Sequence, residues 1–156
     1  MSNLYVLVGV PASGKSTWVN NQKWKDECVY VSTDEFVEDY AKECSLTYSE
    51  VFDDYMPRAL ELMVERVLWA KSLGKDIIWD QTSTTIKARA KKLRMLPDYY
   101  AIAVVFKTPE NAELQRRLTS RPGKIIPQEV VDNMCLQLIN EPPSLEEGFM
   151  EIWHAE

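Results

Sequence analysis

The residues best suited to chemistry lie near the start of the chain, in "GVPASGKSTW" at positions 9–18. The spacing of Gly9, Gly14, Lys15 and Ser16 is typical of a loop whose backbone N–H groups point at the phosphates of a nucleotide. We expect the Lys15 ammonium to reach the β- and γ-phosphates and the Ser16 hydroxyl to bind Mg²⁺. The predicted ATP-binding residues of this loop are Gly9, Pro11, Ala12, Ser13, Gly14, Lys15, Ser16 and Thr17.

Two carboxylates that follow apolar runs could take part in phosphoryl transfer. Asp34 comes just after the run at 28–33, where a carboxylate can orient the hydroxyl that attacks a phosphate. Its alternative role is to stabilise the start of a helix electrostatically. Asp80 ends "DIIWD", a position that suits a group holding the water shell of Mg²⁺. The alternative for Asp80 is a hydrogen-bonded residue at the start of a loop.

A third group consists of cations in "LQRRLTSRPGKIIP" (114–127), between two predicted helices. Arg117 and Arg121 share a helical face if the helix continues that far. A mobile loop with arginines can close over ATP, exclude water and neutralise charge on the phosphoryl oxygens. We therefore predict that both arginines contact ATP and that Arg121 acts in catalysis with Lys15 and Asp34. The alternative is a solvated basic helix end.

Alternating strands and helices must position these groups. Short apolar runs predict strands at 4–8, 28–33, 76–80 and 101–106, with a weaker candidate at 149–155. The predicted helices start at Lys15, run from Ser32 or Thr33 to Glu43, start again at Thr47, and then occupy 57–74, 83–96, 108–120 and 127–140. The helix at 57–74 is expected to bury an apolar stripe of Leu60, Val64, Val67 and Leu68.

This alternation predicts a parallel sheet between layers of helices, since parallel strands need crossover connections. The predicted fold class is α/β: a P-loop NTPase three-layer sandwich of four or five strands, adenylate-kinase-like, with an arginine-rich lid. The length of 156 residues fits a single domain over 1–156. The pattern leaves the order of the strands open.

Composition restricts location and partners. No apolar run approaches the roughly 20 residues of a membrane helix, so we expect no membrane partner. "MSNLYVLVGV" predicts a core strand rather than a signal peptide, and the three cysteines lack metal-ligand spacing. These features predict reduced thiols and a cytoplasmic location. The net charge of −6 weighs against broad binding to a polyanion.

Charge is nevertheless unevenly distributed along the chain. Residues 34–65 contain ten acids against two bases, whereas 87–94 contain five bases and no acid. In the basic helix, Ile86, Ala90 and Leu93 are expected to form the buried face. Lys87, Lys91 and Arg94 would then form an exposed stripe beside Arg89 and Lys92. This stripe could bind an acceptor or could be an ordinary solvated face.

In order and intervals, "GVPASGKSTW", "STDEF", "WDQTS" and "ELQRRLTSRPGKIIP" resemble the kinase domain of bacteriophage-type polynucleotide kinases. The resemblance covers nearly the whole chain. It implies an adenylate-kinase-like P-loop fold and transfer of the ATP γ-phosphate to a 5′-hydroxyl of DNA or RNA. It implies that Asp34 is the general base, that Asp80 and Thr82 border the acceptor, and that Arg117 and Arg121 contact the ATP phosphates and adenine.

One departure from this family concerns the acceptor. Three residues beyond the base the family commonly has an arginine that holds an acceptor phosphate, whereas this chain has Val37, followed by Glu38 and Asp39. Losing an Arg–phosphate contact costs about 2 kcal/mol. Either another cation, such as the basic stripe of Lys87, Lys91 and Arg94, replaces it, or the acceptor is not an ordinary polynucleotide.

The sequence thus predicts an ATP- and Mg²⁺-dependent kinase that acts on the 5′-hydroxyl end of a nucleic acid. The first alternative is a small-molecule kinase for a nucleoside, sugar or antibiotic, which Val37 and the acidic segment favour. The second alternative is a module that binds ATP without transferring phosphate. The chain contains no D-x-D-G-T motif, so no 3′-phosphatase activity is expected. The oligomeric state is left open.

Overall fold

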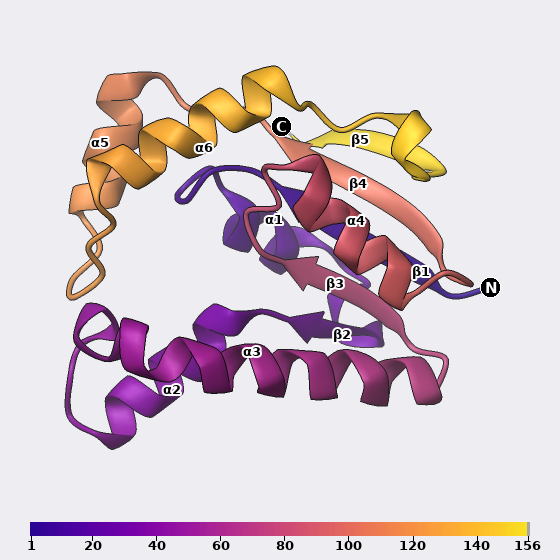
Figure 1. Ribbon diagram of the computed structural model, residues 1–156, viewed down its shortest axis with the longest axis horizontal. Coiled ribbons are helices and arrows are strands. Elements are labelled where there is room, and N and C mark those ends of the chain that lie inside the picture. The colour runs from indigo at the N-terminus through magenta and orange to yellow at the C-terminus, as the bar shows by residue number, and fades with distance from the viewer. Residues whose placement is uncertain (156) are drawn as a thin grey trace.

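A parallel sheet of five strands forms the centre of the structure, a computed structural model that describes residues 1–155 (Figure 1). The strands are β1 (Asn3–Val8), β2 (Cys28–Val31), β3 (Asp76–Asp80), β4 (Tyr100–Phe106) and β5 (Glu151–Ala155). Their order is β2-β3-β1-β4-β5. All five predicted strands, including the weaker C-terminal one, are therefore present, and β1 lies in the centre with β3 and β4 beside it.

Helices cover both faces of this sheet, as expected of a three-layer sandwich. They are α1 (Lys15–Asn21), α2 (Thr33–Glu43), α3 (Tyr48–Ser72), α4 (Ile86–Met95), α5 (Asn111–Thr119) and α6 (Gln128–Asn140), with short 3₁₀ turns at Lys25–Glu27 and Leu145–Glu147. Side chains of β1 alternate between the two faces. Leu4 and Val6 pack with residues of α3 and α4, whereas Tyr5 and Leu7 pack with residues of α1. None of the helices in residues 1–155 is long and apolar enough to cross a membrane.

Helix α3 differs from its prediction in two ways. The expected pair of helices is one continuous helix that contains Pro57, because a capping box of Thr47 and Glu50 starts it well before the proline. Of the expected buried stripe only Val67 is buried, since Leu60, Val64 and Leu68 are 42%, 37% and 50% exposed. The face against the sheet and α2 consists instead of Val51, Ala59, Met63, Val67 and Ala70.

The buried face of α4 is a second correction. Ile86 is 45% exposed, whereas Arg89 and Lys92 are 0% and 6% exposed. Arg89 can be buried because its guanidinium pairs with Glu147 at 2.8 Å and donates to two backbone carbonyl oxygens. Lys92 lies 5.3 Å from the centre of the Trp79 ring, and burial lowers its pKa to about 8. The stripe of Lys87, Lys91 and Arg94 is exposed, as predicted.

Candidate active site

The loop between β1 and α1 has the backbone geometry of a phosphate cradle. A Cβ atom on Gly9 would lie 2.5 Å from Ser13 Oγ and 2.9 Å from Phe106 Cβ, so glycine is required by the close packing there. Gly14, just before α1, has a φ of 101°, which side chains rarely tolerate. The N–H of Gly9 also donates to the carbonyl of Thr82 at 3.0 Å, which joins this loop to the one after β3.

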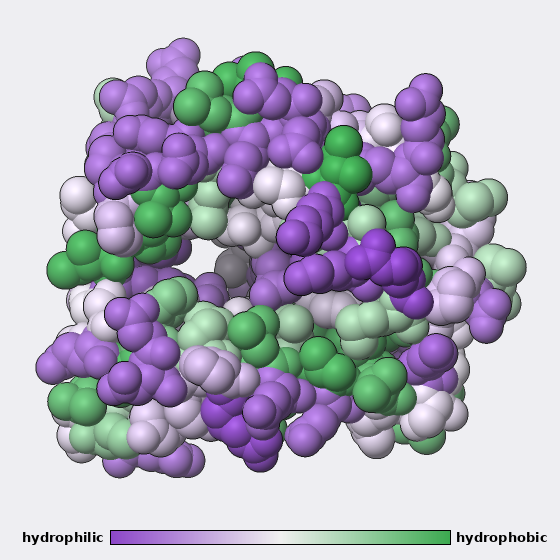
Figure 2. Space-filling model, viewed as in Figure 1, coloured by the Kyte–Doolittle hydropathy of each residue, from purple (hydrophilic) through white to green (hydrophobic). Residues whose placement is uncertain are grey.

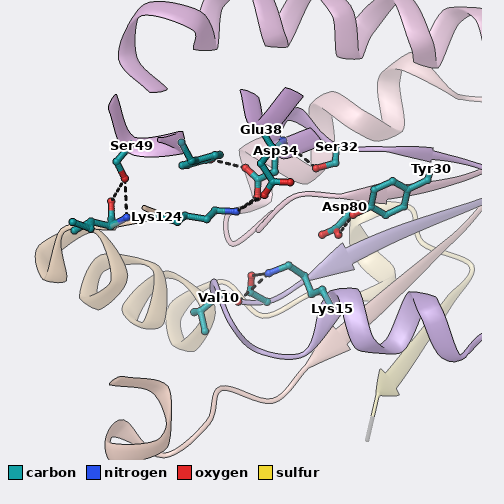
Figure 3. Close-up of polar contacts among 12 residues, drawn as sticks. Val10, Lys15, Tyr30, Ser32, Asp34, Glu38, Ser49, Asp80 and Lys124 are labelled. Carbon is teal, nitrogen blue, oxygen red and sulfur yellow. Dashed lines mark hydrogen bonds and ion pairs between the residues drawn. The ribbon is translucent and has the colours of Figure 1, made fainter. Parts of the chain in front are cut away.

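Lys15 folds back over this loop. Its ammonium donates to the carbonyl oxygens of Gly9 and Val10, each at 2.9 Å (Figure 3). Loss of solvent lowers the pKa of Lys15 to about 8, although Asp80 and Asp34 nearby favour the charged form. At neutral pH the loop therefore presents a positive charge that is poorly hydrated, which is favourable for binding an anion.

Asp34 lies in the first turn of α2 and is held at both carboxylate oxygens. Oδ1 accepts a hydrogen bond from the Tyr48 hydroxyl at 2.6 Å, and Oδ2 pairs with the Lys124 ammonium at 3.1 Å. Its side chain is 50% exposed, so further hydrogen bonds from a ligand are possible. Burial and the charge of Asp34 raise the pKa of the Tyr48 phenol far above its ordinary value, which keeps this hydroxyl a donor.

Asp80 occupies the end of β3 and faces the same space as Asp34 and Lys15 (Figure 3). It accepts a hydrogen bond from the Tyr30 hydroxyl, which orients the carboxylate. Burial raises the pKa of Asp80, opposed by this hydrogen bond and by the charge of Lys15. A cation at this position would favour the ionised form of Asp80.

The two predicted lid arginines differ in their partners. Arg117 donates to Glu113 at 2.8 Å and to the carbonyl of Ala12 at 3.1 Å, which places it against the phosphate loop. Arg121 has two fully buried guanidinium nitrogens, Nε and Nη2, without a hydrogen-bond partner in residues 1–155. Buried unpaired donors are costly, and an anion is the kind of group that would satisfy them.

These side chains surround one large cleft, with a volume of about 1790 Å³. Figure 2 shows this face of the molecule hollowed between α5 and α6 above and α2 and α3 below. The predicted residues that line the cleft are Pro11, Ala12, Ser13, Gly14, Lys15, Ser16, Thr17, Asp34, Asp80, Thr82, Arg117 and Arg121. The other loop residue, Gly9, contributes through its packing under the loop.

The basic stripe of Lys87, Lys91 and Arg94 does not line this cleft. Helix α4 starts beyond the cleft and runs along the face of the sheet, away from the ends of β1 and β3 (Figure 1). The prediction that these cations bind an acceptor therefore has no support from their position. It assumed that a helix starting just after Thr82 would stay at the edge where ligands gather.

Sequence reasoning missed the wall that α3 contributes. Tyr48, Phe52, Met56 and Leu60 line the cleft, together with Asp53. Their spacing of four residues places them on one side of the helix, and this periodicity is the signal that could have identified them. It was obscured because Pro57 and Thr47 were assigned to different helices.

Comparison with known proteins agrees with this geometry. The family model described as an AAA domain matches residues 4–139. The chain belongs to the AAA domain family. The match includes the phosphate loop, Asp34, Asp80 and the lid arginines. No curated protein matches this member of the family significantly.

Solved structures with similar folds include several kinases. A candidate kinase from Chloroflexus aurantiacus has a TM-score of 0.71 at 16% identity, with 98% of this chain and 88% of that one covered. A protein of the PezAT toxin–antitoxin system of Streptococcus pneumoniae has a TM-score of 0.65 at 20% identity (99% and 69% covered). Shikimate kinase from Aquifex aeolicus has a TM-score of 0.56 at 16% identity (97% and 86% covered).

These similarities show that the chain has the P-loop kinase fold. They confirm the predicted fold class. They give no support to the bacteriophage polynucleotide kinase type in particular, which leaves the predicted 5′-hydroxyl acceptor without support from comparison.

Proposed function

We propose that this AAA-family protein is a phosphotransferase that moves the γ-phosphate of ATP to the hydroxyl of a small acceptor. The observation that carries the proposal is that Asp34, Lys15 and Arg121, which come from three different loops or helices, line one cleft. A carboxylate that faces a phosphate cradle and a buried unpaired guanidinium is the combination that transfer needs. Binding of ATP alone gives no role to the carboxylate.

The residues of the cleft fit ATP and Mg²⁺. The unpaired nitrogens of Arg121 and the unpaired buried hydroxyl of Ser13, taken over residues 1–155, are groups that phosphate oxygens would satisfy. Ser16 and Asp80 both line the cleft and supply oxygen donors, which Mg²⁺ prefers. When bound there, Mg²⁺ neutralises charge on the phosphate oxygens.

In the proposed reaction, Asp34 accepts the proton of the acceptor hydroxyl. The hydroxyl oxygen forms a bond to the γ-phosphorus as the bond from that phosphorus to the bridging oxygen of ADP breaks. Lys15 and Arg121 balance the charge on the oxygens that move. Arg117, anchored on the carbonyl of Ala12, orders the phosphate loop from the lid side.

The acceptor side of the cleft favours a small uncharged compound over a polyanion. Its α3 wall consists of Tyr48, Phe52, Met56 and Leu60, with Asp53 between them. Phe52 and Leu60 are 38% and 42% exposed there. Carboxylates repel phosphate groups, whereas apolar and aromatic side chains pack well against a ring.

The 5′-hydroxyl end of a nucleic acid is the second candidate, favoured by the arginine-rich segment and its order relative to the other motifs. An acceptor screen with labelled ATP separates the candidates. We expect labelling of nucleosides or other small alcohols, and preference for 5′-hydroxyl oligonucleotides would replace the first candidate with the second.

The variant Asp34→Asn tests the mechanism. We expect its turnover to fall by about 100-fold or more, the usual scale for a positioned base, with ATP affinity changed far less. Undiminished turnover would remove Asp34 from the reaction. Tight ATP binding without transfer to any acceptor would identify a non-catalytic module instead.

A further inference from the structure

The segment between α5 and α6 is attached to the first turn of α3, on the acceptor side of the cleft. The carbonyl of Gly123 accepts from the N–H of Ser49 at 3.0 Å, and the N–H of Ile125 donates to Ser49 Oγ at 2.7 Å. Gly123 has a φ of 70°, and a Cβ there would lie 2.9 Å from Thr47 Cβ. The lid backbone is thus packed against the capping residue of α3.

Lys124 extends from this docked segment to the carboxylate of Asp34 (Figure 3). Its side chain is 15% exposed, and its ammonium lies 3.1 Å from Asp34 Oδ2 and 3.4 Å from Glu38 Oε1. The same ammonium lies 4.4 Å from the centre of the Tyr48 ring, within the range of a cation–π contact. Both carboxylate oxygens of Asp34 are therefore held, one by Tyr48 and one by Lys124.

The lid segment also carries the nucleotide-side arginine. Arg121 is three residues before Lys124, and its buried guanidinium lines the cleft beside the phosphate loop. The N–H of Lys124 donates to the carbonyl of Arg121 at 3.4 Å, so the two residues belong to one turn and the ion pair of Lys124 restrains the backbone that carries Arg121. One ion pair thus joins the half of the cleft that fits ATP to the half that holds the carboxylate.

We propose that Lys124 is a positioning residue: it latches the lid to Asp34, holding the lid closed over bound nucleotide and the carboxylate in the orientation that accepts a proton. The catalytic part of this inference rests on the proposed function, but the latch itself does not. Each oxygen of Asp34 keeps a further acceptor position, so an acceptor hydroxyl can bind without displacing Lys124.

Release of a fluorescent ATP analogue, measured by stopped flow after a chase with unlabelled ATP, tests the latch without any chemistry. We expect Lys124→Met to speed release by about fivefold, the upper scale for a half-exposed ion pair. Asp34→Asn should also speed release, by no more than this factor, because it removes the shorter ion pair of Lys124 and leaves the one to Glu38. Without a latch, loss of this negative charge would slow release, since the carboxylate would no longer repel the phosphates.

The double variant completes the cycle. With a latch, Asp34→Asn combined with Lys124→Met releases the analogue no faster than Lys124→Met alone. Additive effects, or slower release in Asp34→Asn, would overturn the inference. Lys42→Met is the matched control, since it removes one exposed positive charge on α2 outside the cleft lining and should leave release unchanged.

Steady-state kinetics tests the positioning role. We expect Lys124→Met to lower kcat by about tenfold with a smaller change in the KM of the acceptor, and Lys124→Arg to restore most of kcat. A loss confined to the KM of ATP would mean that Lys124 only binds nucleotide and would overturn the positioning role. If the wild-type protein transfers nothing while the release cycle is non-additive, the proposed function fails and the latch stands. If the protein transfers phosphate but the effects of the two substitutions on release are additive, the proposed function stands and the latch fails.

Discussion

The buried ion pair between α4 and the 3₁₀ turn at 145–147 allows a prediction whose size follows from the structure. Arg89 is fully buried, and its guanidinium makes four hydrogen bonds. Two go to the carboxylate of Glu147, at 2.8 and 3.2 Å, and two go to the carbonyls of Ser83 and Glu141, at 3.0 and 2.7 Å. Glu147 is only 7% exposed, so it has little water to replace a lost partner.

The variant Arg89→Met keeps most of the side-chain volume and removes the charge. It leaves the Glu147 carboxylate buried without its charge partner and with only the N–H of Ser144 as a donor, a change that costs about 3–5 kcal/mol. With a urea m-value of about 2 kcal/mol/M, the unfolding midpoint should fall by about 1.5–2.5 M. Replacing both partners, as Arg89→Met with Glu147→Leu, should recover part of that loss, because no unpaired charge remains.

Urea unfolding followed by circular dichroism gives these midpoints. Arg94→Met is the matched control, since Arg94 is an exposed arginine on the same helix and its loss should change stability by about 0.5 kcal/mol or less. A loss below about 1 kcal/mol in Arg89→Met would mean that Arg89 has access to water. The buried face assigned to α4 would then be wrong.

Two further predictions concern the nucleotide side of the cleft. Loss of solvent lowers the pKa of Lys15 to about 8, so raising the pH from 7 to 9 neutralises its ammonium, and the Kd for ATP measured by calorimetry should rise by about tenfold. The variant Lys15→Met should bind ATP weakly at both pH values. A pH effect that survives in this variant would exclude Lys15 as its source. The variant Arg121→Met should weaken ATP binding by about 10- to 100-fold. The melting temperature of the nucleotide-free protein should stay unchanged or rise, because the unpaired buried nitrogens of Arg121 destabilise the protein without nucleotide. A lower melting temperature with unchanged ATP affinity would contradict the role assigned to Arg121.

The strands and the phosphate loop could be predicted because their signals are local. Each strand is a short apolar run, and each of those runs is a strand in the structure. The loop before Lys15 is specified by two glycines with strict backbone roles, one in a close contact and one at a positive φ. The positive φ of Gly14 is a local requirement, whereas Gly9 also packs against Phe106 of β4, yet the spacing of the motif identifies both glycines without knowledge of that contact.

The faces of α3 and α4 could not be predicted because they depend on distant partners. Leu60 and Leu68 are apolar at helical spacing, yet the sheet and α2 cover a different side of α3, which small residues such as Ala59 and Ala70 fit. From the sequence alone Arg89 is interpreted as a surface residue. In the structure its Nε lies 2.8 Å from Oε1 of Glu147, which comes 58 positions later in the chain. Hydropathy alone ranks Ile86 above Arg89 for burial, and long-range pairing reverses that order.

The surroundings of Asp34 also depend on contacts between distant residues, and they change how Val37 is interpreted. The Val37 side chain is fully buried in a cluster with Ala41, Val51 and Ala59, so it packs between α2 and α3 and does not face the cleft. An arginine there would have to displace this cluster or bury its charge. The cation nearest to Asp34 comes from the opposite side, on the lid, as Lys124. The valine is therefore not a simple loss of a phosphate contact, because in this fold the docked lid supplies the positive charge beside the carboxylate.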